Sequence, residues 1–492
     1  MDSTTAGALA PDGVPGARRR GKPGLLINRD FALLWLGQTV SVTGDMMFNT
    51  TLVIWIALGL TAHISWSPVA VSAVLIAAAA PTLLVGFFAG VFVDRANKRL
   101  MMLWMDGLRV VIVALLILAT GVIPLPGLAS GRLPLLWALG AIYAVVALVN
   151  AGEQFFRPSA MAIIQEVVPQ EQQARAMGFS QVSVSLALII GPAAAAPLYA
   201  AFGPEWALLI DAATFVVSYI TIYLLRAPRH ATVSQASAPH AANATHAAPR
   251  HGFWREMWAG MRFYFSNRPL VTLLIAVIVA VAGASALNTL DVYYATQNLH
   301  ATTAMYGLIG GVFGLGAILG SIIFGLTAQR IGLARTLWLA LAVFGLLVVG
   351  LTQVTNYEVA LGFFLVAGAL NSGLNVAAGP IMMRETPPAL MGRVMSIFNP
   401  ASSLAILLAT AGVGYLAGIT LRDFHAVWLD LPFGTISVIY LGGGVLMTLS
   451  GIVVLIGLVG VDRRYRHEDR EAAQAARAAE AAATSQVATV TA

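Results

Sequence analysis

The sequence predicts an all-α membrane protein with twelve transmembrane helices in two pseudo-symmetric six-helix halves. Three observations lead to this prediction: the apolar composition, a series of long apolar stretches, and motifs that occur twice. Apolar residues make up 58% of the 492 residues, charged residues make up 10%, and the mean hydropathy is +0.81. A soluble domain carries about 25% charged residues, so we expect a lipid bilayer to surround most of this chain.

The apolar stretches are long enough to be membrane spans. Each has the roughly 20 residues with which an α-helix crosses about 30 Å of hydrocarbon. Short connections join neighbouring spans, except between the sixth and the seventh. We place the twelve spans at residues 31–60, 68–93, 100–121, 134–160, 173–202, 205–225, 269–296, 304–328, 334–353, 358–382, 392–419 and 432–460.

The remaining residues form two tails and a middle linker. We expect cytoplasmic tails at residues 1–27 and 462–492, and a cytoplasmic linker at 227–266 between halves at 28–226 and 267–461. The first part of the linker is rich in Ala, Pro, Ser and His, which is typical of a disordered connection. Its histidines are irregularly spaced, so we interpret them as solvated side chains and predict no metal site.

The basic residues predict the orientation of the chain. With both termini in the cytoplasm, nearly all of the 28 Lys and Arg residues fall on the cytoplasmic side, and only Arg132 and Arg422 fall outside. Short cytoplasmic loops are enriched in Lys and Arg. We therefore expect a multi-pass protein of the inner (cytoplasmic) membrane with both ends inside. The net charge of +6 reflects this topology, and we expect no nucleic-acid partner.

Several motifs of the first half recur in the second. Residues 86–99 and 320–335 both end an apolar helix in a short basic turn and then begin another helix. An Asn-Arg pair precedes the first span at Asn28 and the seventh at Asn267. Such repeats predict two halves that face each other across a central cavity, as in duplicated transporters.

Residues 28–460 resemble the major facilitator superfamily. The stretch Gly90-x-x-x-Asp94-Arg95-x-x-Lys98-Arg99 matches the signature of that family between spans two and three. Residues 28–45, 156–169 and 206–215 are similar to the branch that contains macrolide-efflux and related drug or siderophore exporters. The resemblance implies a secondary active transporter that exports amphipathic drug-like or secondary-metabolite molecules by proton-coupled alternating access.

Two other functions stay open from the sequence. One is a siderophore exporter or another exporter of narrow specificity, and the other is a membrane receptor or binding protein that transports nothing. An enzyme is disfavoured because the sequence has no phosphate-cradling Gly-x-x-x-x-Gly-Lys-Ser/Thr loop, His-Glu-x-x-His site or Gly-x-Ser-x-Gly site. We therefore expect no cofactor, a small amphipathic substrate, and a monomer.

The repeated basic turn is the first candidate gating element. Asp94, at a helix end, could accept hydrogen bonds from a neighbouring helix N-terminus. The resemblance implies that it helps to hold the cytoplasmic side shut in the outward-facing state. The second copy has Gln329 instead, so we do not expect a latch with charges on both sides. The alternative interpretation is that the turn only anchors the helices at the headgroups. The candidate gating residues are Gly90, Asp94, Arg95, Lys98, Arg99, Arg157, Gly325 and Arg330.

Gly191-Pro192 in the fifth span resembles the Gly-Pro signature of drug/proton antiporters. Proline removes a helical hydrogen bond, and glycine permits a bend or close packing. The match is partial, because alanines replace the glycines expected after it. An ordinary kink is the alternative interpretation.

Four acids inside the spans are the candidates for proton coupling. Asp45, Glu153, Asp211 and Asp291 would each be costly to keep charged in the bilayer. Asp45 is the first choice because it also matches the branch pattern. Glu153 is spaced for an i,i+4 ion pair with Arg157. The arginine that other drug/proton antiporters carry early in span four is absent here, so coupling to Na⁺, or no coupling, stays open.

Spans one, four, seven and ten line the central cavity in the superfamily that the chain resembles. Plentiful Met, Phe and Trp residues suit adaptable binding of bulky amphipathic molecules, although most aromatic residues would serve ordinary packing. The candidate cavity residues are Asn49, Thr50, Asn150, Gln154, Asn288, Asn371 and Asn375.

Overall fold

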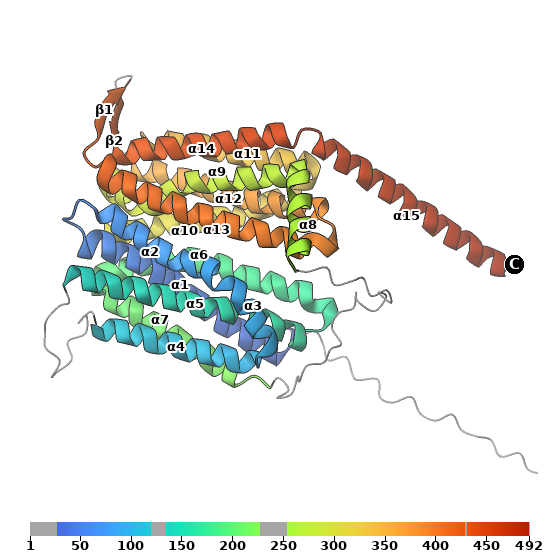
Figure 1. Ribbon diagram of the computed structural model, residues 1–492, viewed down its shortest axis with the longest axis horizontal. Helices are drawn as coiled ribbons and strands as arrows, with labels where there is room; N and C mark the ends of the chain where they lie inside the picture. Colours follow the sequence, from blue (N-terminus) through green and yellow to red (C-terminus); the bar gives the residue numbers. More distant parts are fainter. Residues whose placement is uncertain (1–26, 120–133, 227–252, 429–430, 492) are drawn as a thin grey trace, which may run out of the picture.

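The computed structural model describes residues 27–119, 134–226, 253–428 and 431–491 (Figure 1). Within these residues, 12 helices are long and apolar enough to cross a membrane. The number of spans predicted from the sequence is therefore confirmed. Figure 1 shows the helices running side by side in two bundles, with α15 projecting from one end and a β-hairpin at the other. We call these the tail end and the hairpin end.

The first bundle contains α1 to α7. Its elements are α1 (Arg29–Ile54) with its π-helical extension η1 (Trp55–Leu60), α2 (Ser67–Leu84), α3 (Gly86–Arg95), α4 (Lys98–Ala119), α5 (Leu135–Val167), the 3-10 turn η2 (Gln170–Gln172), α6 (Gln173–Phe202) and α7 (Pro204–Tyr223).

The second bundle follows a short helix, α8. The elements are α8 (Phe253–Ser266), α9 (Arg268–Tyr293) with its π-helical extension η3 (Tyr294–Asn298), α10 (Thr303–Ile331), α11 (Leu333–Leu351), α12 (Tyr357–Glu385), the 3-10 turn η4 (Pro388–Leu390), α13 (Met391–Tyr415) with η5 (Leu416–Thr420), the hairpin strands β1 (His425–Trp428) and β2 (Leu431–Gly434), α14 (Thr435–Gly457) and the tail helix α15 (Val461–Thr491).

The two bundles repeat one packing pattern. In the first, α1 packs on α6 and α7, α4 packs on α5 and α7, and α2 packs on α5; in the second, α9, α11 and α10 make the corresponding contacts with α13, α14 and α12. The bundles meet where α2 packs on α13 and where α6 packs on α10. This arrangement confirms the prediction of two similar halves.

The repeated Asn-Arg motif has the same structural task in each half. The side-chain oxygens of Asn28 and Asn267 accept hydrogen bonds from backbone N–H groups three residues on, at 2.8 and 3.3 Å. Their side-chain nitrogens donate to Val167 O at 2.6 Å and to Glu385 O at 3.3 Å. Each asparagine thus caps the first helix of its half and satisfies an otherwise unpaired carbonyl at the end of the fourth.

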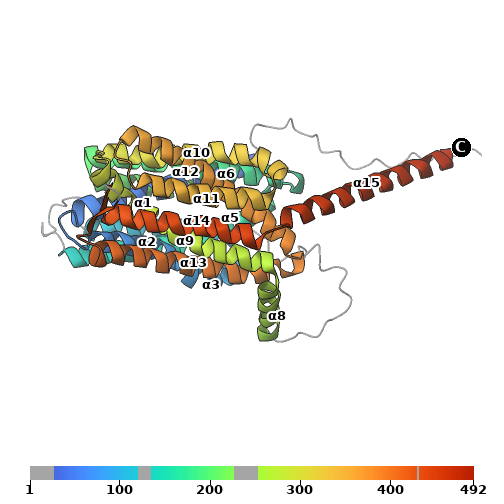
Figure 2. The same ribbon diagram turned by 90° about the horizontal axis from the view of Figure 1, so that it is seen from above.

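The structure differs from the predicted boundaries in two places. The expected single span at 68–93 is broken at Val85 into α2 and α3, because Pro81 lacks an N–H group and Gly86 is a poor helix former. The last part of the expected linker is the helix α8, which begins beside α9 and α13 at the tail end and projects sideways from the bundle (Figure 2). Its exposed Trp258 and Phe265 are typical of a helix at a membrane surface. Residues 227–252 of the linker lie outside the described part of the chain.

Candidate functional site

A chain of hydroxyl groups joins the two halves at the hairpin end. Ser67 Oγ in α2 and Tyr293 Oη in α9 share a hydrogen bond of 2.6 Å. Thr61 Oγ1 lies 2.6 Å from Ser67 Oγ and donates to Ile56 O, also at 2.6 Å. The side chains of Ser67, Tyr293 and Thr61 are buried, so this network holds α2 of the first half against α9 of the second.

Pro192 and the glycines of α10 form a second contact between the halves. A Cβ atom at Gly310 would lie 2.7 Å from Pro192 Cβ, and one at Gly314 would lie 2.8 Å from Ile189 Cγ1. Only glycine therefore permits this approach of α10 to α6. Gly191, beside Pro192, faces the backbone of α1 at Met46. The Gly-Pro pair of α6 thus packs on both halves.

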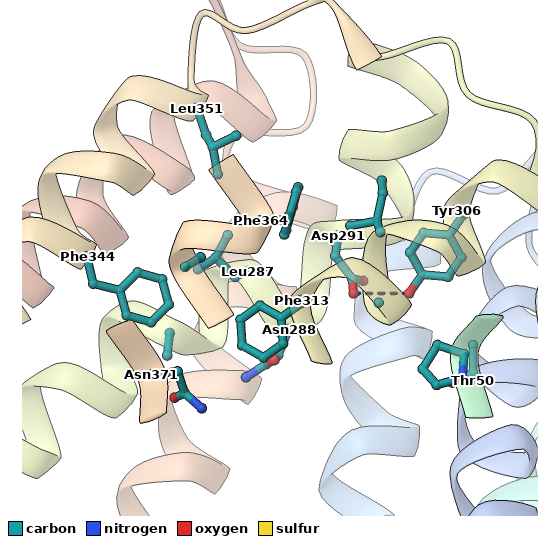
Figure 3. Close-up of a pocket in the computed structure, with 15 residues that line it drawn as sticks. Thr50, Leu287, Asn288, Asp291, Tyr306, Phe313, Phe344, Leu351, Phe364 and Asn371 are labelled. Carbon is teal, nitrogen blue, oxygen red and sulfur yellow. Dashed lines mark hydrogen bonds between the residues drawn. The ribbon is translucent and has the colours of Figure 1, made fainter. Parts of the chain in front are cut away.

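A central cavity of about 240 Å³ lies between the halves. The first half supplies Thr50 and Pro192, and the second supplies most of the wall. In Figure 3 the carboxylate of Asp291 faces the Tyr306 hydroxyl, which donates to Asp291 Oδ2 at 3.0 Å. Asp291 Oδ1 accepts from the backbone N–H of Val292 at 2.7 Å. The carboxylate is thereby held at the cavity wall.

The structure divides the polar residues predicted to line the cavity. Asn288, Asn371 and Thr50 lie in its wall. Asn49 and Asn375 lie on the same helices as Thr50 and Asn371 but outside this wall, whereas Asn150 and Gln154 lie on α5, which contributes no residue to it. Asn150 donates to Val146 O at 2.9 Å, Gln154 donates to Thr82 Oγ1 at 3.3 Å, and Asn375 donates to Asn371 O at 3.0 Å; Asn49 is part-exposed on α1.

A buried group of charges lies inside the first half. Asp106 and Arg109 of α4 have 0% and 3% of their surface exposed, and Asp211 of α7 has 0%. Both carboxylate oxygens of Asp211 and Nε of Arg109 lack a hydrogen-bond partner within the described structure, and the carboxylate of Asp106 is within reach of the Ser218 hydroxyl. Asp45 of α1 is part-buried and within electrostatic reach of these groups. We call Asp45, Asp106, Arg109 and Asp211 the acidic cluster.

Small and aromatic residues make room for this cluster. A Cβ atom at Gly44 would lie 3.0 Å from Asp211 Oδ1, and one at Gly152 would lie 3.3 Å from Arg109 Nε. The Arg109 guanidinium carbon lies 5.5 and 5.2 Å from the ring centres of Phe156 and Phe215, within the range of cation–π attraction.

Sequence reasoning missed two members of the cluster. Asp106 was not among the candidate acids, and Arg109 was counted with the basic residues of the cytoplasmic side, although both lie inside α4. The signal was present, because an acid and a base one turn apart inside an apolar span are themselves unusual.

Glu153 and Arg157 form the ion pair that their spacing predicts, but it is loose. Arg157 Nε lies 4.0 Å from Glu153 Oε1, with 76% and 34% of the two side chains exposed. An exposed pair of this kind contributes about 0–1 kcal/mol. The pair with Arg157 therefore does not fix the position of the Glu153 side chain.

Two residues of the repeated basic turn tie helices together at the tail end. Lys98 Nζ lies 2.8 Å from Glu166 Oε1 at the end of α5. Arg99 Nε donates to Ile222 O at 3.1 Å, at the end of α7. Arg95 and Arg330 are exposed, and Gly325 has no atom within 4 Å of its Cβ position. The side chains of Asp94 and Gln329, and the surroundings of Gly90, lie outside the described part of the structure.

The tail helix α15 supplies an acid to the second half. Asp462 accepts hydrogen bonds from the backbone N–H groups of Ala334, at 2.9 Å, and Arg335, at 3.1 Å, and so caps α11. Tyr465 donates to Glu385 Oε1 at 2.7 Å, and Arg464 forms an ion pair with the same carboxylate. These contacts join α11 and α12 to α15. In the first half, Lys98 and Arg99 of the basic turn make the comparable connections to α5 and α7.

Twelve spans in two repeated bundles, with a cavity between them, define a transporter of the major facilitator superfamily and not an enzyme. Within that superfamily, the chain belongs to the family described as transmembrane secretion effector, whose model matches residues 24–423.

Three known proteins illustrate this relationship. The chain is 24% identical over 438 residues to the uncharacterized MFS-type transporter YkuC of Bacillus subtilis, covering 88% of this chain and 93% of YkuC. It is 23% identical over 381 residues to macrolide efflux protein A of Streptococcus pyogenes, covering 76% and 86% of the two chains. A bacterial homologue of the iron transporter ferroportin, solved in an inward-facing state, superposes with a TM-score of 0.65 at 16% identity, over 89% of this chain and 100% of that chain. This last likeness concerns the fold alone.

Proposed function

We propose that this protein exports amphipathic drug-like or secondary-metabolite molecules by proton-coupled alternating access. Membership in the secretion effector family supports export, and the similarity to a macrolide efflux protein supports the substrate class. The observation that carries proton coupling is the acidic cluster, in which three carboxylates lie within electrostatic reach of a single arginine.

Protons are the simplest means to balance this charge. An unpaired carboxylate costs several kcal/mol in a low-dielectric interior, and protonation removes that cost. Asp211 has no hydrogen-bond partner in the described structure, and the Ser218 hydroxyl is the only side-chain hydrogen-bond partner within reach of Asp106, so binding a proton would stabilise both. Asp45 is part-buried, whereas Asp106 and Asp211 have 0% of their surface exposed, so Asp45 is the acid through which the cluster would exchange protons with water. Asp45 is therefore our first choice for the coupling residue, and Glu153 is a nearby relay.

Helix α6 connects α1, which carries Asp45 of the acidic cluster, with α10 of the second half. Gly191 packs on Met46, the neighbour of Asp45, while Pro192 packs on α10 and lines the cavity. A shift of α1 that follows protonation of Asp45 would therefore move α6 against α10. We propose that Gly191 and Pro192 transmit this movement from α1 to α10, in addition to any bend that they cause in α6.

We propose that the tail end faces the cytoplasm and that the protein lies in the cytoplasmic membrane. The basic residues near the tail end favour this orientation. The contacts that close the hairpin end would then make the present conformation inward-facing. In the outward-facing state, the basic turn with Asp94, Lys98 and Arg99 would close the opposite side, together with α8 and the tail helix.

Inside-out vesicles that contain the protein test this function directly. A ΔpH is imposed, a pH-sensitive dye reports the lumen, and macrolides, lincosamides, tetracyclines and siderophores are added one at a time. Proton release that depends on one compound supports antiport and names a substrate class. Release with siderophores alone would favour a narrow exporter. Binding without transport or proton movement, by folded protein, would contradict the proposal and favour a receptor.

A further inference from the structure

We infer that the central cavity recognises a molecule with a single positive charge on an apolar body, and that Asp291 is its counter-ion. This inference rests on the proposed export function, because it names the class of substrate that the exporter takes. It gives Asp291 a role separate from the coupling role that its sequence position suggests.

The only charged side chain among the described residues of the cavity wall is acidic. Among the 15 described residues that line the cavity, Asp291 is the only charged one, and none is Lys, Arg or His (Figure 3). An anionic substrate would find no basic side chain in this wall. A cationic substrate would find a carboxylate, together with Asn288 and Asn371, whose amide oxygens can accept hydrogen bonds.

The carboxylate of Asp291 retains free capacity for hydrogen bonds. Oδ1 accepts one from Val292 N, and Oδ2 accepts one from the Tyr306 hydroxyl. An ionised carboxylate offers about four lone-pair sites, so these two bonds leave room for an ammonium group. The two bonds also fix the direction in which the carboxylate points, which favours selective binding.

The rest of the wall suits an apolar body next to a charge. Phe313, Phe344 and Phe364 line the cavity with Tyr306, and aromatic rings attract cations through their faces. The volume of about 240 Å³ lies below the roughly 300–1,000 Å³ of typical pockets for drug-sized ligands. In this conformation, the cavity therefore suits a cationic group and its adjoining rings, and not a whole macrocycle.

Asp291 is separate from the acidic cluster. None of the four cluster residues lines the cavity, and all of them belong to the first half, whereas Asp291 belongs to α9 of the second. The substrate charge and the coupling proton would thus be held by different acids in different halves.

Two ions of nearly the same size and shape but opposite charge provide the test. Equilibrium binding of tetraphenylphosphonium and tetraphenylborate is measured on the purified full-length protein in detergent, with empty micelles subtracted. We expect the wild type to bind the phosphonium at least about tenfold more tightly, and Asp291→Asn to lose about 10- to 100-fold of that affinity, as for a lost contact to a charged group.

Two matched variants complete the experiment. Asp291→Glu keeps the charge and should retain most of the binding, whereas Asp423→Asn removes an exposed carboxylate near the hairpin and should match the wild type. Equal affinity of the wild type for both ions would overturn the inference, whether or not Asp291→Asn folds. Unchanged phosphonium binding in folded Asp291→Asn would also overturn it.

The vesicle assay separates this inference from the proposed function. If a compound drives proton release while the binding test fails, export stands and the cation site is wrong. If no compound drives proton release but the phosphonium preference depends on Asp291, the cation site stands and the export function is wrong.

Discussion

Ser67 and Tyr293 share a buried 2.6 Å hydrogen bond across the boundary between the halves. It joins α2 to α9 only two residues beyond Asp291, which lines the cavity. Helix α9 therefore carries both the contact between the halves at the hairpin end and the acid of the proposed binding site.

Tyr293→Phe should weaken closure of the hairpin end. Losing one hydrogen bond costs about 1 kcal/mol, which is a shift of roughly fivefold between two states. A cysteine placed at Ala284, in the cavity wall, should react correspondingly faster with a membrane-impermeant maleimide added from the hairpin side. Tyr143→Phe is the control, because Tyr143 donates to Ala70 O within the first half, at 3.0 Å. An equal acceleration in the control would contradict the assignment.

Gly310→Ala should destabilise the contact between α6 and α10. The new methyl group would lie 2.7 Å from Pro192 Cβ, and overpacking of this kind costs about 1–3 kcal/mol. Thermal unfolding in detergent should show a lower Tm, together with faster labelling of the cavity from the hairpin side. Gly412→Ala, which adds a methyl group to open space on α13, should leave both measurements unchanged. A Tm for Gly310→Ala equal to that of the control would argue against tight packing here.

Asp45→Asn should abolish efflux driven by ΔpH and leave expression intact. The amide is similar in size to the carboxyl group but cannot bind and release a proton. The vesicle assay measures this loss, and Asp45→Glu should retain part of the activity. Near-normal ΔpH-driven efflux by Asp45→Asn would remove Asp45 from the coupling mechanism.

Arg109→Gln should destabilise the protein more than Arg109→Gln combined with Asp106→Asn. Removal of one partner from a buried charged group costs about 3–5 kcal/mol, because the other charge is left uncompensated. The double variant removes a charge of each sign, so it should recover much of the lost Tm. Unfolding of Arg109→Gln, Asp106→Asn and the double variant, each compared with the wild type, gives the coupling energy as a double-mutant cycle. Additive losses would mean that Asp106 and Arg109 do not interact.

Deletion of residues 461–492 should destabilise the tail end, whereas deletion of residues 472–492 should not. The longer deletion removes Asp462, Arg464 and Tyr465, which hold α11 and α12. Burial, reinforced by the Glu385 carboxylate, raises the pKa of Tyr465. Its neutral hydroxyl should therefore stabilise the fold fully below about pH 10, the usual pKa of tyrosine, and less as the pH rises further. Equal Tm values for the two truncations would contradict this role.

The sequence determined the features that depend on local composition and spacing. Apolar length alone predicts the spans, and the repeated asparagines at 28 and 267 predict where each half begins, because capping involves residues three apart. The intramembrane positions of Asp45, Asp211 and Asp291 also followed from the sequence, since a charge in an apolar stretch is visible without a structure.

Only the tertiary structure decided what each of these residues faces. A helix in a bilayer is apolar on nearly all sides, so its sequence pattern does not show how it is rotated against its neighbours. Packing alone placed Asp291 in the cavity wall, gathered Asp45, Asp106, Arg109 and Asp211 inside the first half, and set Pro192 against the glycines of α10. These contacts join residues far apart in the chain, and they depend on close helix approach, which the sequence of one helix does not specify.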